Sequence, residues 1–340
     1  MGKQKNCTIR ELAQYVGLST CTVSKVLNHP SEELSIPERT QAKVREAARK
    51  LNYVPNVNAQ RFFTRRSFVI GLLVPSQEEM GHNVFHDTHF ADIMSGIEQA
   101  LKGTSYHLLL LFNRPDFRYA GMFSSGLLDG LLIWGAHRSE QYREKLVELT
   151  GPRIFLTSIP DSGKEMPPLH YIASDYEQAA EGIALRLKQS GCRSFCWLAG
   201  KPDTSIISQL CSGMKKAGII LSPSAIRYSD YTESDGEALA AELLENGHYD
   251  ALLATAPQLA RGAARAVEKR NMRIQIGCFD GQERTRLPSD HFFCAQTCDV
   301  EIGKCAVEEL LALLENRKKL VQRKIPVTFA ENESISGRLI

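Results

Sequence analysis

Three side chains near the N-terminus have the chemistry needed to read DNA. The hydroxyl groups of Thr20 and Thr22 can bond to base edges or phosphates, and the Thr20 methyl group can contact a thymine methyl. Lys25 is long enough to reach the acceptors of guanine or a phosphate oxygen. The pattern fits a helix face that enters the major groove, and a solvated polar face on a small helical unit is the alternative.

Two short helices are expected to hold these side chains. Thr8 and Glu11 have the spacing of a capping box, and apolar residues follow at helical intervals. Gly17 is suited to end the first helix in a left-handed conformation, and Ser19 to cap the second. A tight turn containing glycine between two such helices predicts a helix-turn-helix unit.

A third helix and a short segment follow the helix pair. Pro37 is suited to the first position of a helix that runs to about Leu51, because its missing N–H has no partner there in any case. Pro55 disfavours helix at the preceding residue. The segment 57–63 is too short to be a stable helix by itself.

This order of elements resembles the LacI-type family of lactose and galactose repressors. The match is dense over the first sixty residues and looser over nearly all of the remaining chain. The matching residues are Thr8, Ala13, Gly17, Ser19, Thr22, Val23, Ser24, Val26, Asn28, Thr40, Val44, Leu51, Asn52, Tyr53, Pro55, Asn56 and Ala59.

The resemblance implies roles for individual residues. Thr20, Cys21 and Lys25 would read the major groove. Phe62 stands where the family has a leucine that wedges into the minor groove from a hinge helix, and packing of Phe62 against the core is the alternative. The DNA-binding residues expected on this basis are Thr8, Ser19, Thr20, Cys21, Thr22, Ser24, Lys25, Asn28, Thr40, Tyr53, Asn56, Ala59, Gln60 and Phe62.

The charge is unevenly distributed along the chain. The 340 residues have a net charge of +2, with 41 Lys/Arg and 39 Asp/Glu. Residues 1–66 carry 12 Lys/Arg and 5 Asp/Glu, a net +7, which leaves 29 and 34 in the remainder, a net −5. A basic head on a mildly acidic body indicates a polyanion partner for the head alone.

The body of the chain alternates between buried-type strands and helices, which predicts doubly wound parallel sheets. The expected strands cover 68–75, 107–112, the end of 126–134, 153–157, 195–199, 225–228, 251–254, 274–279 and 293–296. The expected helices cover 90–101, 142–149, 177–190, 205–217, 236–246, 259–270 and 300–316. The last helix is placed back on the first half, and the whole resembles the periplasmic sugar-binding fold.

The expected organisation therefore has three parts. Residues 1–54 would form an all-α helix-turn-helix domain, and residues 55–66 a hinge helix and linker. Residues 67–340 would form an α/β core of two doubly wound parallel-sheet subdomains, one of about 67–172 plus 300–330 and one of about 173–299. Small ligands in such folds lie in the cleft beyond the carboxyl ends of the strands.

Nothing in the sequence predicts an enzyme, a metal site or a cofactor. Phosphate-binding glycine loops, nucleophile elbows and metalloprotease motifs do not occur. His82, His86 and His89 share a polar segment that is interpreted as a solvated loop rather than a metal site. The nine cysteines are scattered, most as expected buried thiols, with Cys21 exposed. Because no secretory signal or membrane span is apparent, the expected location is the cytoplasm.

The expected effector cleft departs from that of sugar-binding relatives. Leu210 stands where those relatives usually have an arginine, and Ala256-Pro257 where they have Asn-Asp. Loss of these groups removes most of the paired hydrogen bonds to hydroxyls or carboxylates. We therefore expect a more apolar cleft, or none that binds ligand. Its expected residues are Phe90, Trp134, Leu210, Tyr231 and, as the polar anchor, Asp280. The alternative for Asp280 is a cap on the loop at Gly281.

These features predict a sequence-specific transcriptional regulator, a repressor that acts as a homodimer on a near-palindromic DNA operator. A small-molecule effector, a sugar or another metabolite, would modulate it unless the lobes are fixed. The alternative is a cytosolic small-molecule sensor with no role at DNA, against which the basic and complete head argues.

Overall fold

The computed structural model divides into two units, residues 1–68 and 69–340. Each unit is described separately below. The residues described are 7–28, 35–54, 64–80, 83–114, 120–135, 149–157, 169–200, 205–229, 231–281 and 292–329.

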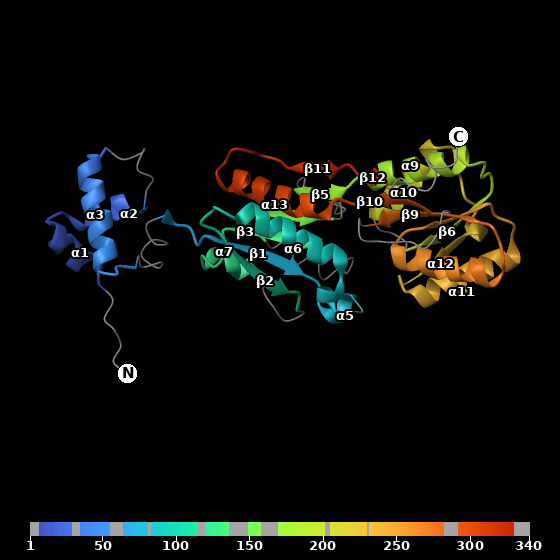
Figure 1. Ribbon diagram of the computed structural model, residues 1–340, viewed down its shortest axis with the longest axis horizontal. Coiled ribbons are helices and arrows are strands. Elements are labelled where there is room, and N and C mark those ends of the chain that lie inside the picture. Colours follow the sequence, from blue (N-terminus) through green and yellow to red (C-terminus); the bar gives the residue numbers. More distant parts are fainter. Residues whose placement is uncertain are drawn as a thin grey trace, which may run out of the picture. The chain divides into compact units, whose positions relative to one another are not determined.

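The N-terminal unit is a bundle of three helices (Figure 1). They are α1 (Ile9–Val16), α2 (Thr20–Asn28) and α3 (Glu38–Lys50). Apolar side chains from all three meet in one small core. Its buried members are Leu12, Ala13, Val16, Val23, Val26, Val44, Ala47 and Ala48. The predicted helix-turn-helix and third helix are confirmed, and Pro37 lies one position earlier than expected, at the N-cap of α3.

The larger unit contains two sheets, each with its own helices. We call the first sheet with its helices the first lobe. Its strands lie in the order β11-β5-β4-β3-β1-β2, and all described pairs are parallel. The strand bounds are β1 Val69–Val74, β2 His107–Phe112, β3 Gly130–Trp134, β4 Arg153–Leu156, β5 Tyr171–Ser174 and β11 Gln322–Ile325.

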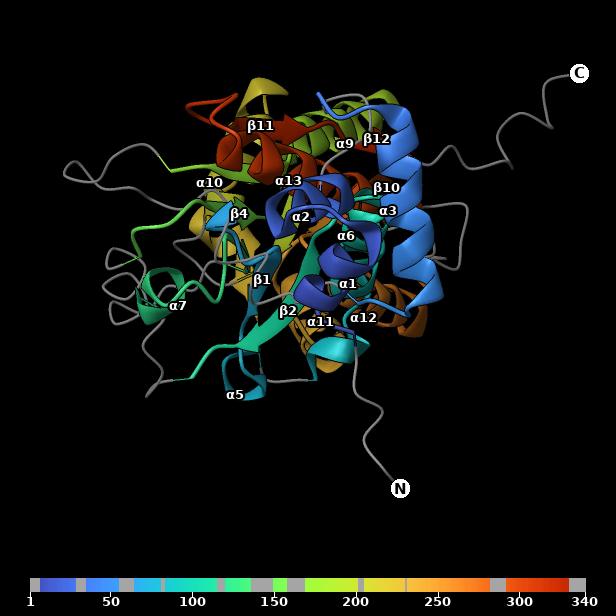
Figure 2. The same cartoon turned by 90° about the vertical axis from the view of Figure 1, so that its left-hand side faces the viewer.

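The helices of the first lobe come from both ends of this unit. Helix α13 packs along α6 and belongs to the same hydrophobic cluster, so the predicted return of the last long helix is confirmed (Figures 1 and 2). The expected helix 142–149 lies almost entirely outside the described residues. The bounds are α5 Gln77–Met80, the 3-10 helix η2 Val84–His86, α6 Thr88–Leu101, α7 Ala120–Ser124 and α13 Asp299–Leu314.

The second lobe is built on the other sheet, with strand order β12-β10-β9-β8-β6-β7. The described pairs are parallel except that β12 runs antiparallel to β10. The strand bounds are β6 Phe195–Ala199, β7 Ile226–Tyr228, β8 Ala251–Ala254, β9 Gln275–Gly281, β10 Phe292–Gln296 and β12 Thr328–Phe329. The helix bounds are α9 Tyr176–Gln189, α10 Ser205–Lys216, η3 Pro223–Ala225, α11 Glu233–Asn246 and α12 Pro257–Lys269.

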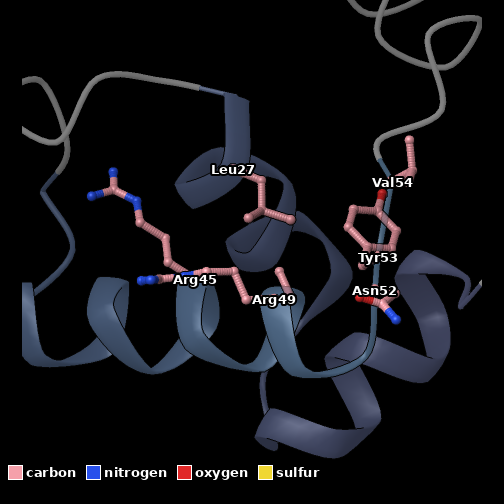
Figure 3. Close-up of a pocket in the computed structure, with 7 residues that line it drawn as sticks. Leu27, Arg45, Arg49, Asn52, Tyr53 and Val54 are labelled. Atoms are coloured by element: carbon pink, nitrogen blue, oxygen red, sulfur yellow. The ribbon is translucent and has the colours of Figure 1, made fainter.

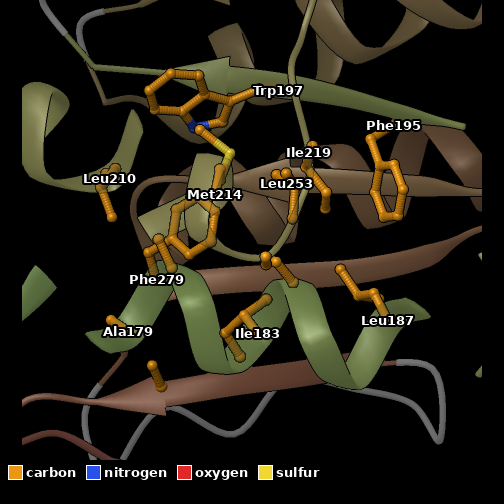
Figure 4. Close-up of a cluster of buried hydrophobic side chains, with 14 of the residues drawn as sticks. Ala179, Ile183, Leu187, Phe195, Trp197, Leu210, Met214, Ile219, Leu253 and Phe279 are labelled. Carbon is orange, nitrogen blue, oxygen red and sulfur yellow. The ribbon is translucent and has the colours of Figure 1, made fainter. Parts of the chain in front are cut away.

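One face of the second sheet is covered by α9 and α10. Figure 4 shows the core there, where Trp197 and Phe279 from the sheet face Ile183 of α9 and Met214 of α10. The Trp197 indole N–H donates to the Thr255 hydroxyl at 3.1 Å, which satisfies the one polar group of this buried ring. Trp197 is 1% exposed, so this core packs closely beneath the sheet whose strand β9 carries Asp280.

The chain passes between the lobes at three places among the described residues. It crosses from β5 to α9, from β10 to α13, and from β11 to β12. Two glycines set the spacing of α6 and α13 after the second crossing. A Cβ atom at Gly96 would lie 1.9 Å from the Val300 carbonyl oxygen, and one at Gly303 would lie 2.1 Å from the Ile93 carbonyl oxygen. Only glycine at both positions allows the two helix backbones to approach this closely.

Candidate DNA-binding surface and interlobe site

Helix α2 exposes one face and buries the other. Thr20, Cys21 and Lys25 are exposed, whereas Val23 and Val26 are almost fully buried against α1 and α3. The exposed set consists of a hydroxyl, a thiol and an ammonium group, each able to bond to base edges or phosphates. The three residues proposed to read bases therefore lie on the solvent-facing side of a helix that is held by its opposite side.

Side-chain caps fix the starts of the first two helices. The Thr8 backbone N–H donates to the Glu11 carboxylate at 2.7 Å, and the Glu11 N–H donates to the Thr8 hydroxyl at 3.3 Å. The Thr22 N–H donates to the Ser19 hydroxyl at 3.0 Å. The predicted caps are thus confirmed. The first turn of α2 has no acidic side chain, so its start leaves partial positive charge where a phosphate oxygen is favoured, whereas at α1 the Glu11 carboxylate already occupies this position.

The other expected DNA contacts are less exposed or lie outside the described part of the chain. Thr22, Ser24, Thr40 and Tyr53 are partly buried, and burial raises the pKa of the Tyr53 hydroxyl. Asn28 is the last residue of α2. The expected hinge contacts lie outside the described residues, namely Asn56, Ala59, Gln60 and Phe62.

The structure adds Lys43 to the residues that shape this surface. Its ammonium group donates to the carbonyl oxygen of Val16, the last residue of α1, at 2.9 Å. A cation is favourable at the C-terminal end of a helix, where carbonyl groups lack backbone partners. Lys43 therefore ties α3 to the turn between α1 and α2. The two residues are 27 positions apart, so no local pattern in the sequence indicates this contact.

A cavity of about 600 Å³ lies on the head between α2, α3 and the residues after α3. Figure 3 shows Leu27 of α2 over α3, with Arg45 and Arg49 on α3 and Tyr53 at the other side. The cavity does not include Thr20, Cys21 or Lys25. It is therefore a separate feature from the exposed face of α2.

An ion-paired histidine lies where the two lobes meet. His89 is in the first turn of α6, in the first lobe, and its Nδ1 atom is 2.8 Å from Oδ2 of Asp299. Its Nε2 atom is 3.8 Å from Oδ2 of Asp280, which is in β9 of the second lobe. The interpretation of His89 as part of a solvated loop is therefore wrong. Its partners are too distant in sequence to be seen from local pattern.

The carboxylates around His89 are held by further contacts. The Thr297 hydroxyl donates to Asp299 at 2.9 Å. Burial raises the pKa of Asp280 to about 6, although His89 opposes that rise. Burial by itself would lower the pKa of His89, but Asp280, Asp299 and Asp87 outweigh it and raise the value to about 10. His89 is therefore an imidazolium cation at neutral pH.

The residues expected in the effector cleft come from both lobes: Phe90 and Trp134 from the first, Tyr231 and Asp280 from the second. Phe90 and Trp134 lie against each other in the first lobe, with ring centroids 5.3 Å apart. Asp280 of the second lobe pairs with His89, the residue before Phe90. Tyr231 packs on Gly200. A Cβ atom added at Gly200 would overlap the hydroxyl group of Tyr231. Phe90, Trp134, Tyr231 and Asp280 all lie at or just after strand ends or at a helix start.

Leu210 differs from the expectation. It is fully buried in the core between α9, α10 and the second sheet, so its side chain is not a wall of an open cleft (Figure 4). Two aromatic residues that were not expected extend the ring cluster toward solvent. Phe85 is 60% exposed and lies 5.8 Å from Phe90 and 6.1 Å from Phe112, measured between ring centroids.

The described residues contain no group of three or more His, Cys, Asp or Glu side chains arranged to hold a metal ion. Cys21 is exposed as expected, but so is Cys211, which was expected to be buried. Within the part of the chain that is described, no helix has the length and apolar character needed to cross a membrane.

Comparison with known families and proteins identifies the chain. Residues 8–56 match the family described as bacterial regulatory proteins, lacI family. Residues 67–314, more than two thirds of the chain, match the periplasmic binding proteins and sugar binding domain of the LacI family. The chain belongs to the LacI family. It is therefore a DNA-binding transcriptional regulator, with a helix-turn-helix head and a core of the periplasmic-binding-protein type, and its family is not one of enzymes.

Individual members of the LacI family are similar over almost their whole length. The transcriptional regulator MalR of Streptococcus pneumoniae is 22% identical over 333 residues, covering 94% of this chain and 97% of the relative. The lac repressor dimer bound to operator and an anti-inducer has a TM-score of 0.75 at 21% identity, covering 96% and 98%. The regulator CelR in complex with cellobiose has a TM-score of 0.67 at 20% identity, covering 96% and 99%. The likeness to these solved structures shows the shared fold.

Proposed function

We propose that this LacI-family chain is a cytoplasmic repressor that binds a near-palindromic operator as a homodimer. The observation that carries the proposal is the exposed face of α2, where Thr20, Cys21 and Lys25 project from a helix anchored by Val23 and Val26. Two such heads would read the two half-sites. A lac repressor solved as a dimer on its operator supports this arrangement by analogy of fold.

The proposed domain organisation has a head of residues 1–54, a hinge of 55–66 and a core of 67–340. Thr8, Ser19, Asn28, Thr40, Tyr53 and Asn56 would hold phosphates, while Thr22 and Ser24 would support the reading face. Phe62 from each subunit would enter the minor groove at the operator centre, flanked by Ala59 and Gln60. Changes in the arrangement of the lobes would reach DNA through this segment.

Selection of bound DNA from a random pool tests the proposal. The expected result is a two-fold symmetric consensus, bound by a dimer, with an affinity that falls steeply as salt rises because phosphate contacts release counterions. A consensus without symmetry, or a monomer on DNA, would contradict the homodimer. No preference among sequences would contradict the proposal as a whole and favour a small-molecule sensor.

Substitution of Lys25 tests the reading face directly. If Lys25 contacts a base, Lys25→Ala should weaken operator binding by about 1–3 kcal/mol and relax the preference at one base pair. The matched control is Lys102→Ala, which removes one exposed positive charge at the end of α6 in the core and should leave binding unchanged. An equal loss across all sequences would instead make Lys25 a phosphate contact.

We also propose that the effector cleft is more apolar than that of sugar-binding relatives. Phe90, Trp134 and Tyr231 would form its walls and Asp280 its anchor, and the buried Leu210 would support these from the core. Such walls suit a flatter and less hydroxylated ligand than a simple sugar. Calorimetry with a metabolite panel tests this, and tight binding of a free monosaccharide centred on Ala256 would contradict it.

A further inference from the structure

Both ring nitrogens of His89 face carboxylates from different parts of the core. Nδ1 lies 2.8 Å from Asp299 and Nε2 lies 3.8 Å from Asp280. A neutral imidazole has only one N–H group, so it can donate on one side only. Carboxylates on both sides therefore fit the doubly protonated ring, which gives a positive charge between the first lobe and the second.

The partners of His89 are held firmly in place. Asp280 is part of β9, and Asp299 is the first residue of α13. The Thr297 backbone N–H donates to the Gly281 carbonyl at 2.9 Å, and the Thr297 hydroxyl can donate its one proton to Asp299 at 2.9 Å, which ties the start of α13 to the end of β9. Because α6 and α13 touch at glycines, the backbones that carry His89 and Asp299 are held close together.

All the charged groups around the ring favour its charged form. Asp280 approaches from the second sheet, Asp299 from α13, and Asp87 from the N-cap of α6 itself. Tyr176 of α9 lies beside Asp280 and remains neutral, because burial raises the pKa of its hydroxyl far above the usual value. Three carboxylates surround one cation, so removal of the cation would leave like charges facing one another in a partly buried site.

We propose that the His89 imidazolium is a clamp between the two lobes, which occupies the Asp280 anchor of the proposed effector cleft when no ligand is bound. This clamp would regulate ligand binding in the cleft, and the proposal rests on the proposed function, which places the effector cleft at Asp280. A ligand that displaces His89 must bring its own positive charge, such as an ammonium or amidinium group. A neutral sugar in the same place would leave Asp280 and Asp299 without a counter-charge.

The first test uses the unmodified full chain. Histidine side chains labelled with carbon-13 are titrated by NMR, and the His89 signal is assigned by its loss in His89→Phe. We expect this signal to stay in the protonated position throughout pH 6–8, instead of changing near the ordinary histidine value of about 6.5. Titration of His89 near that ordinary value would overturn the clamp.

The second test measures lobe opening by hydrogen–deuterium exchange. In His89→Phe, amides of 276–281 and 296–299 should exchange at least about tenfold faster, because the ion pair between His89 and Asp280 across the lobes is lost. The matched control is His86→Phe, three residues away and exposed, which should exchange like the unmodified chain. Equal exchange in the two variants would overturn the clamp. Neither test uses DNA, so their failure is distinct from failure of operator binding.

A competition experiment addresses the ligand class. In the unmodified chain, an alkylammonium or amidinium probe should take the place of His89 beside Asp280. It should then slow the exchange of amides 276–281 and shift the NMR signal of His89, whereas neutral glucose should do neither. Displacement of the His89 signal by glucose would refute the charge requirement.

Discussion

Substitution of Gly96 by alanine tests how closely α6 must approach α13. The added Cβ atom would lie 1.9 Å from the Val300 carbonyl oxygen and 2.8 Å from the Lys304 nitrogen. Both are backbone atoms of a helix and cannot rotate aside, so the helices must separate. Overpacking of this kind costs about 1–3 kcal/mol. Overlap with backbone belongs at the upper end of that range, about 2–3 kcal/mol. Alanine regains about 1 kcal/mol of helix propensity, so we expect Gly96→Ala to lower the free energy of unfolding by about 1–2 kcal/mol.

Gly121→Ala is the matched control for this prediction. Gly121 is also helical, in α7, but a Cβ atom there would meet nothing within 4 Å. It should therefore be neutral or stabilising by about 0.5–1 kcal/mol. Urea unfolding followed by circular dichroism measures both variants. If Gly96→Ala were as stable as the unmodified chain, the close contact of α6 and α13 would be refuted.

The facing glycine adds a second measurement. A Cβ atom at Gly303 would lie 2.1 Å from the Ile93 carbonyl, on the same helix contact. Once one alanine has pushed the helices apart, the second should cost less than it does alone. The double variant should therefore be more stable than the sum of the two single losses predicts, by about 0.5 kcal/mol or more.

Further predictions concern the head and the interlobe site. Thr8→Ala should lower the free energy of unfolding of the head by about 1 kcal/mol, measured by calorimetry. Thr8→Ser should keep the stability of the unmodified chain, because only the hydroxyl is needed for the cap. Lys43→Met should cost about 0.5–1 kcal/mol by the same measurement, since the α1 C-terminus loses its cation. The pKa of His89 is raised from 6.5 to about 10, so its stabilising effect is greatest near pH 6.5, where Asp280 is still ionised, and is lost as pH rises to about 10. The stability difference between the unmodified chain and His89→Phe should shrink over that range in urea titrations, and a constant difference would contradict it.

Local sequence patterns predict much of this fold. The Thr8–Glu11 box, the left-handed Gly17 and the helical apolar stripes involve residues within one or two turns of each other, and all are found in the structure. Strands β11 and β12 were not predicted. Strand β11 is mostly polar, Gln-Arg-Lys-Ile, and β12 has only two residues, so neither has the apolar run of a buried strand.

The candidate site is harder to predict because its contacts are distant in sequence. The His89–Asp299 pair is 210 residues apart, and only the folded core brings the two side chains together. Leu210 is a different case. It shares a helical stripe with Ile207 and Met214, at spacings of three and four, and all three are buried. The spacing by itself indicates a core position, whereas the resemblance to sugar-binding relatives predicted a place in the cleft.

The route of the chain between the lobes has a consequence for synthesis on the ribosome. Helix α13 and strand β11 complete the first lobe. The ribosome makes them only after all described strands and helices of the second lobe apart from β12. Until residue 325 has left the exit tunnel, β5 has an open edge and α6 an uncovered apolar face. A nascent chain that stops before residue 325 would therefore expose an unpaired strand edge and an apolar helix face to chaperones and proteases, even if its head had already folded.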